Sequence, residues 1–167
     1  MTKDKPTLVP TSSMNFEKQV RILRAYVVLT NYGKAPVHYI QVVRSSRVAR
    51  TQVSGVNSFF VTLGFLEEVE QGIYLPKKEV VDFFNETPGE ENFGTLSPLL
   101  KESPLYNFIK NLILIHGIVT YEQGIEHLLE ESGEKTVSRA KRSLDWLQRS
   151  GLIALKDGNL IVLTSQP

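Results

Sequence analysis

The chain of 167 residues contains no cysteine, so it forms no disulfide, thiolate zinc site or cysteine nucleophile. That absence favours a cytoplasmic protein. No apolar run approaches the roughly 18 residues that a membrane-spanning helix needs. The N-terminus MTKDKPTLVPTSSM also lacks the apolar segment of a signal peptide. We therefore expect no membrane partner, and the length fits one domain or two small ones.

Catalytic and metal-binding signatures are also missing. The sequence has no GxxxxGK[ST] phosphate loop, no GxGxxG after a predicted strand, no GxSxG elbow and no HExxH motif. Its three histidines, His38, His116 and His127, fall in different predicted helices. We expect no catalytic residue, no metal site, no cofactor and no small-molecule substrate, and we predict that the protein is not an enzyme.

Acidic residues are absent from a long internal stretch. The 49 residues from Lys18 to Leu66 contain no Asp or Glu but seven Lys or Arg, whereas residues 67–102 carry a net charge of −6. Partner choice depends on such local charge and not on the total of +1. The first stretch therefore favours an anionic partner.

Two stretches, LGFLEEVEQGIYLP at 63–76 and SGLIALKDGNLIVL at 150–163, repeat one pattern 87 residues apart. Each passes a glycine and continues as two short apolar segments around a turn, Gln71-Gly72 in the first copy and Asp157-Gly158 in the second. This pattern predicts two β-hairpins. Each copy is preceded by three segments with helical spacing, at 15–32, 36–46, 51–63, 104–116, 120–132 and 137–150.

The order of these elements predicts a mostly α chain with small β-hairpins, an α+β fold made of two domains of one kind. We expect a flexible N-terminal arm at 1–14, a first domain at 15–86, an acidic linker at 87–102, a second domain at 103–164 and a tail at 165–167. The first domain ends in an extra helix, PKKEVVDFFNE.

Three helices followed by a hairpin resemble the winged-helix variant of helix-turn-helix proteins. The pieces NSFFVTLGFLEEVEQGIYLP and RSLDWLQRSGLIALKDGNLIVL are similar to the third helix and wing of archaeal and bacterial transcription regulators. The resemblance covers nearly the whole chain after residue 14. It implies two winged-helix domains in tandem, in which the third helix enters the DNA major groove and the hairpin, or wing, contacts the backbone.

The resemblance also implies a small transcription regulator or DNA-associated factor that binds double-stranded DNA. Its outward positions carry residue types that bond base edges or phosphates. In the first copy these are Arg44, Arg47, Arg50, Gln52, Ser54, Asn57 and Ser58, with Gly55 allowing close backbone approach, and in the second copy they are Lys135, Arg139, Lys141 and Arg142. The apolar first helices would supply a homodimer contact or pack the two domains together.

Two observations, the near-neutral net charge of +1 and the acidic wing, favour another interpretation. The acidic wing Glu67–Glu70 would be repelled by phosphate, which favours a non-catalytic scaffold subunit of the chromosome-segregation, transcription-machinery or sorting-complex type. DNA binding requires Arg44, Arg47 and Arg50 to form one exposed patch, whereas the scaffold alternative has them point into the acidic wing.

Structural roles also compete with contact roles in the second copy. Lys141, Arg142 and Arg149 lie three or four residues from Asp145, so ion pairs within the helix are an even alternative to DNA contact. The aromatic residues Phe59, Phe60, Phe83, Phe84 and Trp146 sit at apolar positions of predicted helices, and we expect them in the core.

Overall fold

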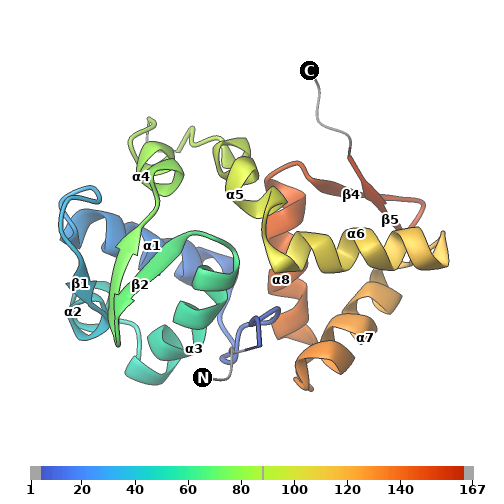
Figure 1. The fold of residues 1–167 in the computed structure, drawn as a ribbon, viewed down its shortest axis with the longest axis horizontal. Coiled ribbons are helices and arrows are strands. Elements are labelled where there is room, and N and C mark those ends of the chain that lie inside the picture. Colours follow the sequence, from blue (N-terminus) through green and yellow to red (C-terminus); the bar gives the residue numbers. More distant parts are fainter. Residues whose placement is uncertain (1–4, 88, 164–167) are drawn as a thin grey trace.

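A computed structural model describes residues 5–87 and 89–163 of the chain. These residues are mostly helical and carry two small antiparallel sheets (Figure 1). The prediction of a mostly α fold with small hairpins is confirmed. The predicted tail at 165–167 and the first four residues of the predicted arm lie outside the described residues.

The first half follows the predicted order of helices and hairpin. Helices α1 (Phe16–Leu29), α2 (Tyr39–Ser46) and α3 (Arg50–Thr62) precede the strands β2 (Leu66–Glu70) and β3 (Ile73–Pro76). One difference is that the predicted second helix does not begin at Pro36. Val37 and His38 instead form a short strand, β1 (Val37–His38), which pairs with β3 and gives a sheet of order β1-β3-β2.

The second half repeats this order. Helices α6 (Pro104–His116), α7 (Tyr121–Ser132) and α8 (Val137–Arg149) precede the strands β4 (Ile153–Lys156) and β5 (Asn159–Val162). Asp157 and Gly158 both have positive φ, 54° and 79°, and they join the paired residues Lys156 and Asn159. This two-residue turn is the one that the Asp-Gly pair predicts.

One hydrogen bond occupies the same place in both halves. The Tyr39 amide donates to the Gly72 carbonyl at 2.9 Å, and the Tyr121 amide donates to the Gly158 carbonyl at 3.0 Å. Each bond ties the start of a second helix to the tip of the following hairpin. Thr120, just before Tyr121, forms a capping box with Gln123.

Part of the predicted acidic linker is ordered structure that packs into the core. After α4 (Lys78–Phe84), the predicted extra helix, the chain forms the 3-10 helix η1 (Phe93–Leu96) and α5 (Ser97–Lys101). Leu96 and Leu100 are fully buried. The sequence did not predict these two helices, because short helices with few apolar residues give little periodic signal.

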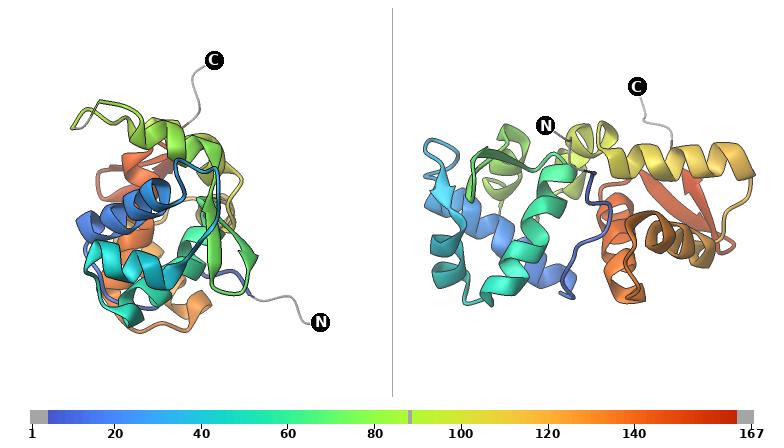
Figure 2. Two further views of the ribbon diagram at one scale, coloured as in Figure 1. Left: turned by 90° about the vertical axis from the view of Figure 1, so that its left-hand side faces the viewer. Right: turned by 60° about the horizontal axis from the view of Figure 1, so that its bottom comes forward.

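The arm predicted to be flexible is packed against the fold over its described part, residues 5–14. It runs between α3 and α8 (Figure 2, right). Leu8, Val9 and Met14 are 7%, 1% and 7% exposed. The Thr11 amide donates to the Gly55 carbonyl at 3.1 Å, and the Ser143 hydroxyl donates to the Leu8 carbonyl at 2.7 Å. The correction has a physical reason: the short apolar pair Leu8-Val9 fills a site that only the folded helices create.

An aromatic cluster joins the two halves into one core. The Trp146 ring of α8 lies 4.5 Å from the Phe16 ring of α1 and 5.0 Å from the Phe65 ring, between centroids. Phe60 and Phe93 complete its surroundings at 6.1 and 6.2 Å. The expectation that Phe59, Phe60, Phe83 and Trp146 are core residues is confirmed by exposures of 0–1%, whereas Phe84 is only partly buried.

Candidate nucleic-acid interface

Three helix N-termini meet around Ser13. Gln52 in the first turn of α3 donates from Nε2 to the Ser13 carbonyl at 3.3 Å. Arg139 near the start of α8 donates from Nε to the Ser13 hydroxyl oxygen at 3.0 Å. Asn15, two residues further on, is the N-cap of α1. Helix N-termini carry partial positive charge, so this junction is electropositive before any side chain is counted.

The arginines of the α2–α3 turn are all exposed. Arg44 lies in the last turn of α2, Arg47 is its C-cap with φ of 59°, and Arg50 begins α3. The Arg50 Nε donates to the Tyr39 hydroxyl at 3.3 Å, and its guanidinium lies 5.9 Å from the Tyr39 ring centroid.

Within the described residues, none of these three arginines forms an ion pair with the acidic wing. One wing carboxylate is instead used locally, since Glu68 Oε2 accepts the Gly72 amide of its own hairpin at 3.1 Å. Arg44, Arg47 and Arg50 therefore remain accessible to an external anion.

Asn57, a predicted DNA-contact residue of α3, has a structural role instead. Asn57 is 3% exposed, and its Oδ1 accepts the Tyr26 hydroxyl at 2.7 Å, so it cannot reach a base edge. That expectation is wrong, because position 57 falls on the face of α3 that packs against α1. Burial also raises the pKa of the Tyr26 hydroxyl well above its ordinary value.

Gly55 does permit a close approach, but by the arm and not by DNA. A Cβ at this position would lie 2.7 Å from the Ser12 hydroxyl oxygen and 3.1 Å from the Ser12 amide nitrogen. Gln52 faces the arm as well, whereas Ser54 and Ser58 are exposed on the outer side of α3.

The basic residues of the second copy divide into paired and exposed groups. Arg139 Nη1 lies 2.7 Å from Glu134 Oε1, and Arg142 Nε lies 3.2 Å from Asp145 Oδ2. The Arg142 pair matches the alternative of an ion pair within the helix. Lys135 and Lys141 are exposed. One face of α8 packs on the first half through Trp146 and Ser143, so α8 does not present the outer surface that α3 presents.

Sequence reasoning missed Ser12, Ser13 and Lys18 as members of this junction. The available signal was local: Ser12 and Ser13 stand just before the first predicted helix, and Lys18 begins the acid-free stretch. Composition cannot reveal that α8, more than 120 residues later in the chain, lies against this segment.

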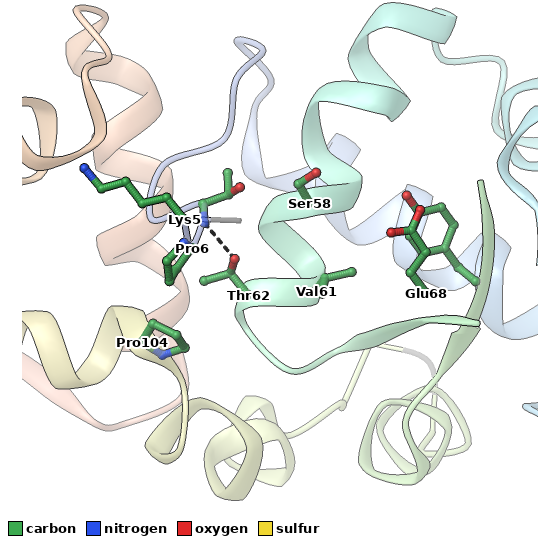
Figure 3. A pocket seen from close by; sticks show the side chains of 9 residues that line it. Lys5, Pro6, Ser58, Val61, Thr62, Glu68 and Pro104 are labelled. Atoms are coloured by element: carbon green, nitrogen blue, oxygen red, sulfur yellow. Dashed lines mark hydrogen bonds between the residues drawn. The ribbon is translucent and has the colours of Figure 1, made fainter. Parts of the chain in front are cut away.

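A separate groove of about 310 Å³ lies between the arm, α3 and the wing (Figure 3). Its floor includes Thr62, whose Oγ1 accepts the Thr7 amide at 2.9 Å. Lys5 and Glu68 line it with opposite charges, and Tyr74 lies beside Glu68. Burial, followed by the charge of Glu68, raises the pKa of Tyr74. Among the described residues that line it, the Ser58 and Thr62 hydroxyls form no hydrogen bond with Glu68.

Histidines and acids do not assemble into a metal site among residues 5–87 and 89–163. In that part of the chain, His116 and His127 stack with ring centroids 5.3 Å apart, without a third ligand. Across the same residues, every helix is too short or too polar to span a membrane.

Comparison with protein-family models, with curated proteins and with solved structures finds no match to this chain. Function is therefore inferred from the geometry of the Ser13 junction and the α2–α3 arginines.

Proposed function

We propose that this protein is a non-enzymatic, double-stranded DNA-binding protein built from two winged-helix units. The observation that carries this proposal is the junction at Ser13, where Gln52 of α3 and Arg139 of α8 meet just before the N-cap of α1. The exposed arginines Arg44, Arg47 and Arg50 lie in the turn that leads into α3. Helix N-termini and arginines are the groups that bind backbone phosphates. A transcription regulator or another DNA-associated factor would use such a surface.

The winged-helix interpretation is supported by the connection order of the first half. The resemblance implies three helices followed by a hairpin, and the first half has α1, α2 and α3 followed by the hairpin of β2 and β3. In winged-helix proteins the third helix reads the major groove. Here the exposed Arg50 and Ser54 of α3 are the side chains that we propose for base contact.

The two copies take different roles in this proposal. Because α8 packs against the first half, it is not available as a second groove-reading helix. Its exposed Lys141, with Lys135 just before it, would instead contact phosphates beside the α3 site. The acidic wing would lie away from the DNA backbone, since phosphate repels its carboxylates.

The test is duplex-DNA binding measured by fluorescence anisotropy as a function of salt. The logarithm of the affinity should fall linearly with the logarithm of the salt concentration. Replacing Arg47 and Arg50 by Ala should weaken binding and reduce the slope by about 1 for each phosphate that these side chains bind in the wild type.

The matched control is Lys34→Ala with Lys77→Ala, which removes the same charge from exposed positions. Gly33, beside Lys34, lies near Val81 of α4, so this control changes a region near α4 rather than the Ser13 junction. It should leave the salt slope unchanged. Absence of duplex binding at about 50 mM salt would exclude the proposal.

A protein-interaction scaffold is the second candidate. It is favoured by Leu114, Ile115 and Ile118, which are 72%, 77% and 70% exposed at the end of α6 and in the turn after it. Clustered exposed apolar side chains are typical of interaction surfaces. A homodimer through the apolar first helix of the second half would cover them. Sedimentation equilibrium tests this: Ile115→Glu should weaken self-association, and a wild-type chain that stays monomeric would argue against the dimer.

A further inference from the structure

A second cavity lies at the Ser13 junction itself, between the arm, α1 and α8. Its volume is about 330 Å³, and its lining residues are Ser13, Met14, Asn15, Lys18, Ser138 and Arg142. None of the described acidic residues lines it. Two segments far apart in the sequence, 13–18 and 138–142, thus build one basic, hydroxyl-bearing pocket.

The charges of this pocket are incompletely balanced within the described part of the chain. Lys18 and Arg142 are both half-buried and come from different helices. Of the nearby acids, Asp145 pairs with Arg142 of the pocket itself and Glu134 pairs with Arg139, so neither of them pairs with Lys18. Glu17, beside Lys18 in sequence, is exposed and does not line the pocket.

Lys18 has no acidic partner within ion-pair distance among residues 5–87 and 89–163. Asp145 already opposes the charge of Arg142, whereas Lys18 lines the pocket without such a partner. An anion bound in the pocket would be attracted by the half-buried Lys18 ammonium, and partial burial strengthens that attraction.

The neutral groups of the pocket can donate hydrogen bonds to the same anion. The Ser13 oxygen already accepts from Arg139, so its own hydrogen is available to point into the cavity. Ser138 lies in the first turn of α8, whose N-terminus has no side-chain cap. Exposed amides at a helix N-terminus are donors suited to an oxyanion.

We propose that this pocket binds a phosphate group through Lys18, Arg142, Ser13 and Ser138. Charge-assisted donors from several directions match a tetrahedral oxyanion better than a planar carboxylate, since four oxygens can be bonded from different sides. The phosphate would come either from a nucleic-acid backbone or from a free phosphate-bearing small molecule. In the first case the site deepens the proposed function and rests on it, and in the second it stands apart from it.

The experiment is a titration of the whole chain with inorganic phosphate in chloride buffer of constant ionic strength, followed by amide NMR shifts. The amides of Val137 and Ser138 should move in a saturable way. Lys18→Met, which keeps most of the apolar stem, should weaken phosphate binding about tenfold or more. Lys110→Met removes an exposed cation of α6 that does not line the pocket, so it is the control and should leave the affinity unchanged.

Two results would overturn the proposal. One is an absence of saturable shifts up to about 10 mM phosphate. The other is binding that Lys18→Met leaves as tight as in the wild type. Ser138→Ala gives a second test that does not alter charge, and it should weaken binding by a smaller factor.

A short DNA duplex then distinguishes the two sources of phosphate. If duplex displaces inorganic phosphate, a backbone phosphate occupies the pocket. If duplex and phosphate bind together, the pocket serves a free ligand. Phosphate binding without any duplex binding would leave this site standing while removing the proposed DNA function, so the two failures are separable.

Discussion

The Trp146 indole nitrogen donates a hydrogen bond to Gln19 Oε1 at 2.7 Å, across 127 residues of sequence. Both residues are buried, at 1% and 0% exposure, and Gln19 Nε2 has no hydrogen-bond partner in the described structure. The bond holds α8 against α1, because breaking it would leave the Gln19 side-chain amide buried without any hydrogen-bond partner.

Trp146→Phe should lower the free energy of unfolding by about 1–3 kcal/mol for the unpaired Gln19 oxygen, in addition to the effect of the smaller ring. Gln19→Met in the same chain should restore part of the stability, because it removes the unpaired amide. Urea denaturation of both single variants and the double variant measures the coupling. Additive effects would show that the bond contributes nothing.

Leu8→Ala should destabilise the chain by about 2–5 kcal/mol, the range for truncating a buried leucine. Leu8 is 7% exposed in the arm between α3 and α8. Lys5→Ala, at an exposed arm position, serves as the control and should change stability by less than about 0.5 kcal/mol. Equal stabilities in thermal denaturation would mean that the arm is not part of the core.

Gly55→Ala should destabilise the chain even though alanine favours helices by about 1 kcal/mol over glycine. The added methyl would collide with the Ser12 side chain and amide and push the arm off α3. Ser54→Ala, exposed on the same helix, should be neutral or slightly stabilising. Limited proteolysis within residues 5–14 reports arm release, and a Gly55→Ala chain that resists cleavage like the wild type would contradict the collision.

Asn57→Ala should reduce stability by about 1–3 kcal/mol while leaving DNA affinity and its salt slope unchanged. The reason is that Asn57 accepts the buried Tyr26 hydroxyl and does not reach the surface. Arg47→Ala should do the reverse, weakening DNA binding with little change in stability. Denaturation and anisotropy on the same samples separate the two effects, and weaker DNA binding by folded Asn57→Ala would return this residue to the interface.

Stability should fall in alkaline solution. Burial raises the pKa of Tyr26 in the folded chain, whereas in the unfolded chain it titrates near about 10. Above that pH the unfolded state loses the proton and the folded state keeps it. The stability that the raised pKa of Tyr26 contributes is therefore fully present below about pH 10 and is lost as the pH rises beyond it.

Urea denaturation from about pH 8 to 11 measures this effect. Tyr26→Phe should make the decline in stability shallower, because it removes one tyrosine whose pKa is raised in the folded chain. Burial also raises the pKa of Tyr74, so this residue should account for part of the remaining dependence of stability on pH. A Tyr26→Phe chain with an unchanged decline would show that other groups control the alkaline transition.

Local features of this fold could be predicted from the sequence because each depends on neighbouring residues. The Asp157-Gly158 turn and the Thr120–Gln123 capping box are specified within four residues, and both form. Features that depend on distant partners could not be predicted. Asn57 has a residue type suited to base contact, yet its neighbour across the fold, Tyr26, makes it a core residue.

The candidate site divides in the same way. The acid-free stretch pointed to Arg44, Arg47 and Arg50, and all three are exposed. The pocket formed by Lys18, Ser138 and Arg142 could not be predicted, because no pattern in one segment records that α8 lies on the N-terminus of α1.

The aromatic cluster around Trp146 also has a consequence for biosynthesis. Phe16, Phe60 and Phe65 are synthesised long before the tryptophan that covers them, so the emerging N-terminal half holds an incomplete core until α8 leaves the ribosome. During that interval the nascent chain exposes aromatic side chains that are prone to non-specific association. This interval is the stage at which chaperone contact would most strongly affect the yield of folded protein.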